Sequence, residues 1–564
     1  MSTAQETRIE DHFNNWPNVK GFDTDYEEKT PVELDVEGQI PAYAAGVLYR
    51  TGPGKYKVDT VHGDTFRVSH WFDGFSETHR FQLIAPDTTH PSMRVFYNSR
   101  FSTDGLIERV RQTGQLGKLS FGQKRDPCKT IYQKVQSEFE PAEPRTPTNL
   151  NVGVTLSVNM PGLDVSSING AGDRWDTSSG IKTLHAKTDY NIFKQLDPQT
   201  LEPVALTTQQ NLHPDLDGPE TASHARSDPK TGDVFNYNLA IKPSPTYRIF
   251  RISASTGETT ILATFPATPA YLHSLLLTED YVILCVWNAH LSVPDLENTS
   301  FVDAIKPFDP STPTIWYIID RKDNKGLVAT YQSPPFFSFH TINSWQEPST
   351  TDQTQTDIIA ELVTFPNLDF MHKLYYENLL SDSPHAKSLV EARRTSTSTS
   401  TITRFRLPSI PSSALNTTTT PTSSPLPAIL ESSRCKSLSP ELPTMNPNYV
   451  TRKHRYTYCV ADRGESTLFD SIMKLDNETH ETLLWAHHAQ SPGEPIFVAN
   501  PDGEDEDDGV LLSVVLDGMS GKSYLLCLDA RGLVELGRAR VNGPVAFGFH
   551  GQHVPVRGIP TGDY

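Results

Sequence analysis

Four histidines could bind a metal ion together, because each lies at the edge of an apolar, strand-like segment. Neutral imidazole is a ligand for iron, copper and zinc, and no cysteine lies nearby to favour a thiolate site. For any one of them the alternative is a core histidine whose ring nitrogens are satisfied by hydrogen bonds. The four candidates are His224 in ETASHARSDP, His273 in YLHSLLL, His340 in FFSFHTIN and His550 in FGFHGQHVP. Most other histidines lie in polar stretches and are expected on the surface, among them His12, His90, His213, His385, His454, His487 and His488.

Acidic residues in apolar settings are the next candidates, because a metal-bound histidine usually donates its second ring N–H to a carboxylate. Three acidic residues stand in such settings: Asp189 in HAKTDYNIFKQLD, Glu441 in PELPTMNP and Glu494 in SPGEPIFVANP. Glu494 stands between glycine and proline just before an apolar run, which is a poor place for a solvated side chain. An ordinary surface carboxylate remains the alternative for each.

The spacing of the histidines indicates which elements must position them. They are 49, 67 and 210 residues apart, unlike the i, i+4 spacing of a zinc site on one helix. Such long intervals suit a fold in which several separate strands each bring one ligand to a common axis. The last ligand would then arrive on the strand that closes the ring.

Short β-branched or aromatic runs around turn residues dominate the chain and predict an all-β fold. Six segments each predict two antiparallel strands around a tight turn. Hairpins at such intervals favour the blades of a β-propeller, with a tandem of β-sandwiches as the alternative. The six segments are 193–206, 225–238, 250–265, 318–331, 473–486 and 526–541.

Regular structure other than strands is sparse. Residues 366–381 and 383–394 predict short helices, which would form a cap over one face of the propeller. Residues 395–433 are rich in serine, threonine and proline and predict a surface insertion around one strand at 402–410. We expect residues 1–564 to form a single domain.

Composition excludes several classes of function. The net charge of −19 disfavours nucleic acid and purely electrostatic docking to anionic membranes. No run is apolar and long enough to span a bilayer, and the first residues are not those of a signal peptide. Five scattered cysteines predict reduced thiols, hence a cytoplasmic protein or one resting on a membrane surface. The acidic run DGEDEDDG lacks the calcium-loop pattern and is expected to be a solvated turn.

The segments GVLYRTGPG, HWFDGF, YLHS, FFSFHTIN, FHG and EPIFVANPDGEDEDDGVLLSVV resemble the carotenoid cleavage oxygenase family over nearly the whole chain. The resemblance implies a seven-bladed β-propeller with a helical cap and one ferrous ion on its axis. By motif, the family's four iron ligands correspond to His224, His273, His340 and His550, which leaves His553 as a bystander.

The resemblance also assigns the carboxylates. It pairs Asp189 with His273, Glu441 with His340 and Glu494 with His550. Asp189 departs from the family's glutamate by one methylene, so either its strand lies closer to the histidine or a water molecule bridges the gap.

The resemblance implies a dioxygenase that cleaves a C=C bond of an apolar polyene to carbonyl products. NWPNVKGFDTDYEE and GVLYRTGPGKYKV resemble the fungal torulene-cleaving members, which cut the polyene off-centre. The polyene would bind in a tunnel lined by aromatic residues from 97–101, 336–339 and 547–549. Residues 126–139 resemble the region that some relatives use for membrane contact. Here the segment is rather polar, so we expect its contact to be weak and peripheral. Cleavage of stilbene-type phenylalkenes to aromatic aldehydes is the alternative activity, and a non-catalytic propeller scaffold is the alternative of another class.

Overall fold

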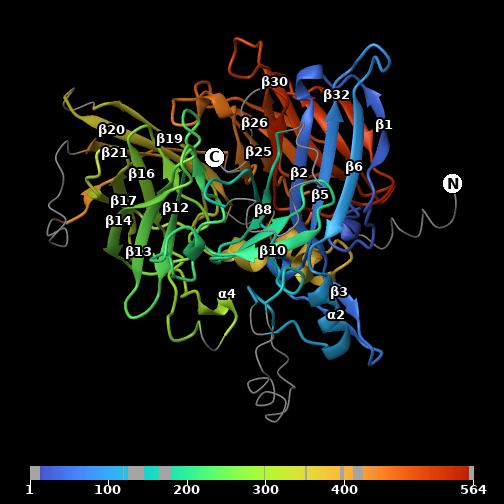
Figure 1. Ribbon diagram of the computed structural model, residues 1–564, viewed down its shortest axis with the longest axis horizontal. Coiled ribbons are helices and arrows are strands. Elements are labelled where there is room, and N and C mark those ends of the chain that lie inside the picture. The colour runs from blue at the N-terminus through green and yellow to red at the C-terminus, as the bar shows by residue number, and fades with distance from the viewer. Residues whose placement is uncertain are drawn as a thin grey trace.

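The chain is built almost entirely from β-sheets that stand side by side around the middle of the molecule, as propeller blades do (Figure 1). One sheet has ten strands, five have four or five strands, and β3 (Lys57–Asp59) forms a two-stranded ribbon with β4 (Thr65–Arg67). The all-β prediction is confirmed. The computed structural model describes residues 13–117, 120–124, 145–163, 180–296, 299–349, 352, 354–393, 399–410, 424–435 and 437–557.

Each of the five smaller sheets is an antiparallel meander of strands that follow one another along the chain, apart from the parallel strand β22 (Leu426–Pro427) beside β18. All six predicted hairpins are pairs of adjacent antiparallel strands. The five sheets contain β7 (Thr155–Val158), β8 (Leu184–Lys187), β9 (Phe193–Leu196) and β10 (Pro203–Thr207); β11 (Arg226–Ser227), β12 (Val234–Ala240), β13 (Thr246–Ile252) and β14 (Thr259–Pro266); β15 (Leu276–Leu277), β16 (Tyr281–Val286), β17 (Thr314–Asp320) and β18 (Leu327–Ser333); β19 (Thr341–Pro348), β20 (Thr356–Thr364), β21 (Thr401–Ile410) and β23 (Ile429–Arg434); and β24 (Glu441–Thr444), β25 (Tyr456–Ala461), β26 (Ser471–Asp476) and β27 (Thr482–Trp485).

The ten-stranded sheet joins the two ends of the chain. Its C-terminal strand β33 (His550–Pro555) pairs antiparallel with β2 (Gly46–Lys55), and β1 (Val32–Gly38) lies between β6 and β32. Strands from both ends therefore share one hydrogen-bonded sheet, and this pairing closes the ring of sheets. The remaining strands are β5 (Phe75–Ile84), β6 (Arg94–Phe101), β28 (Gln490–Pro492), β29 (Ile496–Ala499), β30 (Gly509–Asp517), β31 (Lys522–Asp529) and β32 (Glu535–Arg540).

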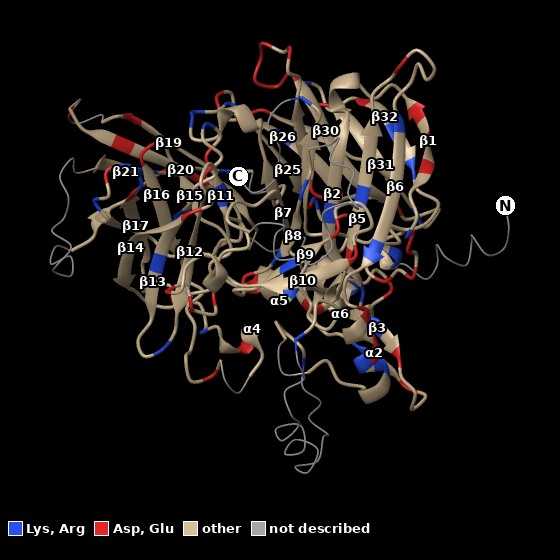
Figure 2. Cartoon of the chain, in the orientation of Figure 1, with Lys and Arg blue, Asp and Glu red and all other residues tan. Residues whose placement is uncertain are grey.

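Four short helices, α2, α4, α5 and α6, lie along one edge of the sheets, the lower edge in Figure 2. The predicted helix at 366–381 is two helices, because Tyr375 has an extended backbone and forms a β-bridge with His70. The helices are α2 (Asp104–Thr113), α4 (Phe301–Ala304), α5 (Asp369–Lys373), α6 (Tyr376–Leu379) and α7 (Pro384–Arg393), with 3-10 turns η1 (Val19–Gly21), η2 (Ala42–Ala44), η3 (Trp71–Asp73), η6 (Gln209–Asn211) and η7 (Pro447–Tyr449).

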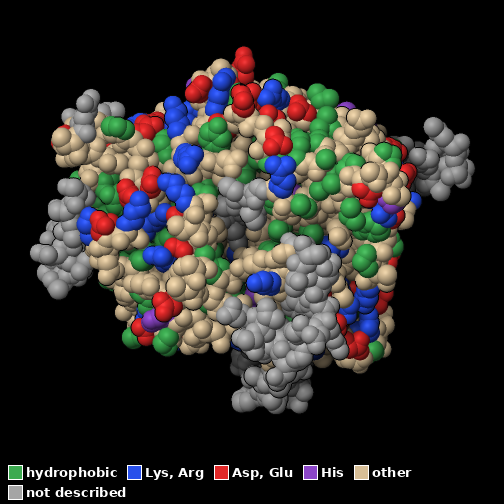
Figure 3. Space-filling model, turned by 45° about the horizontal axis from the view of Figure 1, so that its top comes forward, with side chains coloured by type: hydrophobic (Ala, Val, Ile, Leu, Met, Phe, Trp, Pro, Cys, Tyr) green, Lys and Arg blue, Asp and Glu red, His purple; other side chains and the backbone are tan. Residues whose placement is uncertain are grey.

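The largest hydrophobic core runs from the strands of the β11–β14, β15–β18 and β19–β23 sheets into the helical edge. Acidic and basic side chains are mixed over the face shown in Figure 3. No helix among the described residues has both the length and the hydropathy needed to cross a bilayer. The four cysteines in the described part of the chain, Cys285, Cys435, Cys459 and Cys527, are free thiols.

Candidate metal centre

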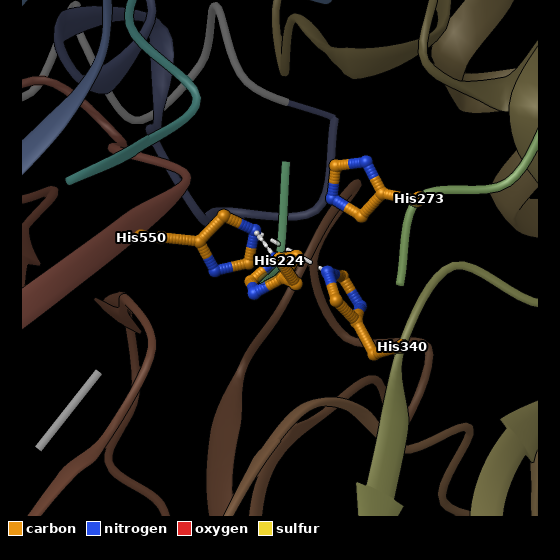
Figure 4. Close-up of side chains that lie close together, drawn as sticks. All are labelled: His224, His273, His340 and His550. Carbon is orange, nitrogen blue, oxygen red and sulfur yellow. Dashed lines mark hydrogen bonds between the residues drawn. The ribbon is translucent and has the colours of Figure 1, made fainter. Parts of the chain in front are cut away.

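The four candidate histidines converge on one point in the middle of the molecule (Figure 4). One ring nitrogen of each lies within 4.8 Å of the corresponding nitrogens of the other three. Nε2 of His550 is 3.0 Å from Nε2 of His224 and 3.3 Å from Nε2 of His340. Residues that are 49 to 326 positions apart in sequence thus form a single cluster whose geometry could hold a metal ion.

Each histidine lies at or just before the first residue of the innermost strand of its sheet. His224 precedes β11, His273 precedes β15, His340 precedes β19 and His550 begins β33. The backbone N–H of His224 donates to the carbonyl of His273 at 3.2 Å, which fixes two of these strand starts against each other. Because the inner strands all begin at this level, their first side chains meet there.

Three of the imidazoles donate Nδ1–H to a buried carboxylate. Asp189 accepts from His273 at 2.8 Å, and Glu494 accepts from His550 at 2.8 Å. Glu441 accepts from His340 at 2.5 Å. These bonds fix the tautomer and direct the Nε2 lone pairs towards the centre. Asp189 reaches its histidine directly, so no bridging water is needed.

The electrostatics of the cluster favour a cation. Burial and the neighbouring imidazoles lower the pKa of His224 and of His550 well below the usual range, so both rings are neutral. Burial raises the pKa of Glu494 to about 7, and the Arg50 guanidinium opposes that shift. In the described part of the chain, Asp189 and Glu441 have ion-pair partners only in their histidines. A divalent cation on the imidazoles would offset this buried negative charge.

Two residues that support the carboxylates were not foreseen from the sequence. Arg50 is buried, and its Nη1 donates to Oε2 of Glu494 at 2.9 Å and to the Glu494 carbonyl at 3.1 Å. Tyr271 donates its hydroxyl to Oδ2 of Asp189 at 3.0 Å. Arg50 could have been suspected because it is a charged residue inside the strand-like segment GVLYRTGPG. Tyr271 could have been suspected because it lies two residues before His273.

Aromatic rings cover one side of the cluster. We call Phe72, Phe121, Tyr271, Phe339 and Phe549 the aromatic wall. The ring centre of Phe339 lies 5.9 Å from those of His273 and Phe72, and Phe72 lies 5.1 Å from Phe549. Two of the three expected aromatic segments, 336–339 and 547–549, thus contribute to the wall.

The third expected segment, 97–101, is divided between two hydrophobic cores. Tyr97 packs into a separate core with Phe81 and Leu48, on the far side of the β2–β5–β6 strands, because alternate residues of a strand face opposite sides. Phe101 lies in the main core, under the Lys55 ammonium group. Phe101 shares this main core with Phe339 and Phe549, so a place for 97–101 in the tunnel stays a prediction.

A cavity opens on the other side of the cluster. Its empty volume is about 770 Å³ when the solvent-filled mouth is counted. His224, His340 and His550 lie in its wall. His273 does not line it. The cavity therefore reaches three of the four histidines. The remaining lining comes from Thr155, Leu156, Ser274, Thr341, Ile342, Leu442, Pro443, Thr444, Met445, Pro447, Val450, Glu494, Ile496 and Gly551.

Other predicted residues have different surroundings. His553 faces away from the cluster, since it is three positions after His550 on a strand, and its Nε2 donates to the Ala44 carbonyl at 3.2 Å. His454, expected on the surface, is buried between Asn343 and Thr457, so that expectation is wrong. Residues 126–139 lie outside the described part of the chain.

Comparison with known proteins gives one family and several close relatives. Residues 21–555 match the model of the RPE65 family, described as retinal pigment epithelial membrane protein. A carotenoid dioxygenase of Neurospora crassa is 43% identical, with 96% of this chain and 92% of the relative covered. A torulene dioxygenase of Fusarium fujikuroi is 38% identical, with 97% and 95% covered. The crystal structure of cobalt-substituted Synechocystis ACO superposes with a TM-score of 0.67 at 22% identity, with 95% and 98% covered.

Proposed function

The chain belongs to the RPE65 family, which includes the carotenoid oxygenases, and from this premise we propose that it is a non-haem iron(II) dioxygenase that cleaves a C=C bond of a carotenoid. The substrate is torulene or a similar long polyene, cut off-centre to apocarotenal products. The observation that carries the proposal is the convergence of four imidazoles, three of them held by carboxylates, beside an aromatic wall. The sequence identity to carotenoid and torulene dioxygenases supports the substrate class.

The residues of the cluster fit ferrous iron. His224, His273, His340 and His550 would hold one ion per chain through neutral nitrogens, a donor type that iron accepts. The carboxylates of Asp189, Glu441 and Glu494 accept hydrogen bonds from three of the rings, and from there they would offset the charge of a bound cation. The related ACO has been solved with cobalt, which replaces other divalent ions in nitrogen sites.

The reaction balances without an added reductant. When bound, iron supplies the site at which dioxygen reacts with the alkene, whose C=C bond is replaced by two C=O bonds. The alkene provides the electrons, and each product carries one oxygen. The aromatic wall holds the polyene chain by apolar contact and excludes water from its own side of the cluster. The carboxylates keep the four rings fixed in orientation while the substrate binds.

The proposal includes a seven-bladed propeller formed by residues 1–564 as one domain, with 395–433 as an insertion. The ten-stranded sheet divides at the β32–β1 contact into two groups, β28 to β32 and β1, β2, β5, β6 and β33, which with the five smaller sheets makes seven blades. The helices α2, α4, α5 and α6 at one edge would form the cap over the iron-bearing face. The ring contact between Phe370 of α5 and Phe339, next to His340, supports that placement.

An apolar polyene partitions into lipid, so we also propose a cytoplasmic enzyme that takes its substrate from a membrane or lipid-droplet surface by weak peripheral contact. The free thiols of the described cysteines support a reducing compartment. Its partners are then the polyene and dioxygen, and nucleic acid is excluded by the net charge of −19.

Replacement of Glu494 by glutamine should lower the iron affinity by about 10- to 100-fold, because the His550 ring loses the carboxylate that orients it. Competition between the protein and a calibrated chelator measures this change. Glu535→Gln serves as the control, since Glu535 pairs with Arg538 on β32 and its loss should leave the affinity unchanged. Equal affinities of the Glu494→Gln and wild-type proteins would contradict the role assigned to Glu494.

The test of the function is product analysis. Iron-loaded protein is incubated with torulene, β-carotene and a stilbene, and the products are identified by mass spectrometry. We expect two carbonyl fragments of unequal length from torulene. Aromatic aldehydes from the stilbene, with both carotenoids intact, would establish the alternative activity instead. Protein that contains no stoichiometric iron and leaves all three substrates intact would support the scaffold alternative.

A further inference from the structure

A five-residue segment, Ser120–Lys124, lies across the aromatic wall and brings Phe121 to it. The ring centre of Phe121 is 4.8 Å from that of Phe72 and 5.6 Å from that of Tyr271. Tyr271 in turn donates to Asp189, the carboxylate that holds His273. Phe121 is thus two side chains away from a candidate metal ligand. The segment has no regular secondary structure, so its position depends on contacts with other parts of the chain.

One carboxylate provides the main contact. Oδ1 of Asp73 accepts the backbone N–H of Phe121 at 2.5 Å, and Oδ2 accepts the N–H of Gly122 at 2.7 Å. Asp73 is 6% exposed, and hydrogen bonds from N–H groups to a buried carboxylate are stronger than those between neutral groups. Burial raises the pKa of Asp73 to about 6, with these bonds opposing the shift, so the group is ionised at neutral pH.

Contacts with η3 and α4 also hold residues 120–124 in this position. A Cβ atom added at Gly122 would lie 2.8 Å from Cβ of His70, so the segment approaches η3 as closely as glycine allows. On its other side, the N–H of Val302 in α4 donates to the Phe121 carbonyl at 2.8 Å. Asp73 is therefore the central charged anchor of a segment held between η3 and α4.

We infer that Asp73 is a positioning residue that holds Phe121 against the polyene and so sets where along its length the polyene lies at the metal centre. This inference rests on the proposed function, because it assigns the aromatic wall to substrate binding. A long polyene has many similar double bonds, and only its placement decides which one is cut. A ring fixed by two backbone bonds on one carboxylate limits how far the chain can slide.

Asp73→Asn tests the inference, because the amide has the same shape but presents an N–H to one of the two N–H donors. We expect the amides of residues 120–124 to exchange hydrogen at least about tenfold faster, since the anchoring bonds are worth more than one kcal/mol each. The Kd of torulene for metal-free protein, read from the quenching of tryptophan fluorescence, should rise about tenfold. The ratio of cleavage products should shift while iron content stays at the wild-type level.

Asp320→Asn is the matched control. Asp320 is buried and also accepts backbone N–H groups, those of Lys322, Asp323 and Lys325, but in the turn between β17 and β18. It should leave exchange at 120–124, torulene affinity and product ratio unchanged. Phe121→Leu removes the aromatic ring and leaves the Asp73 hydrogen bonds in place. If Asp73 acts only through the Phe121 ring, the Asp73→Asn/Phe121→Leu protein should bind torulene no more weakly than Phe121→Leu alone.

Unchanged exchange and an unchanged product ratio in Asp73→Asn would overturn the inference, as would loss of iron from that variant, which would indicate a role at the metal. Should Asp73→Asn not fold, Gly122→Ala displaces the same segment from the His70 side and must give the same shift in products. Wild-type protein that leaves torulene intact would contradict the proposed function, and the exchange measurement would still decide whether Asp73 holds the segment.

Discussion

The His273→Ala protein is expected to lose all measurable cleavage of torulene and most of its bound iron. The substitution removes one of four nitrogen ligands and leaves Asp189 buried without the ring N–H that it accepts at 2.8 Å. Nothing else in the described cluster can replace the nitrogen, because Tyr271 is turned towards Asp189. Iron content by elemental analysis and turnover by product chromatography measure the two effects independently.

His553→Ala is the matched control for this loss. It removes an equally buried imidazole, three residues from His550, whose Nε2 is bonded to the Ala44 carbonyl. We expect a lower melting temperature from the cavity that it leaves, and near-normal iron content in the folded protein. If His553→Ala lost its iron and His273→Ala kept both iron and turnover, the ligand assignment would be wrong.

Arg50→Met should destabilise the protein by about 3–5 kcal/mol, the usual result of removing one partner from a buried ion pair. The Arg50 and Glu494 side chains are 3% and 10% exposed, and their charged atoms are 2.9 Å apart. Methionine fills much of the volume but leaves the Glu494 carboxylate in an apolar interior with only the N–H groups of His550 and Gly551. The shift in the midpoint of urea unfolding at an unchanged slope measures the effect.

A second substitution tests the cause. In the Arg50→Met/Glu494→Gln protein no unpaired charge remains, so part of the lost stability should return. If Arg50 contributed only through packing, the double variant would instead be at least as unstable as Arg50→Met. The double variant is more stable than Arg50→Met in the first case and no more stable in the second. The comparison therefore does not depend on the size of either effect.

Local chemistry explains why the strands and hairpins could be predicted from sequence. The turns at 197–202 and 228–233 carry an aspartate that accepts following backbone N–H groups, and this pattern is complete within a few residues. The convergence of the histidines could also be predicted from sequence, because each lies at the start of its own strand.

Contacts between distant parts of the chain could not be predicted. The helix expected at 366–381 breaks at Tyr375 because His70 pairs with it, some 300 residues away in sequence. His454 lies in a polar stretch and is nevertheless buried by Asn343 and Thr457. The direct contact of Asp189 with His273 depends on how closely two sheets approach, a distance that no local pattern encodes.

The pairing of β33 with β2 places a candidate ligand, His550, on the strand that joins the two ends of the chain. An ion bound there would link β33, the strand that closes the ring, to three other sheets through His224, His273 and His340. Metal binding would then stabilise the closed ring against opening. Protection of the C-terminal strand from proteolysis should therefore increase with the concentration of free metal.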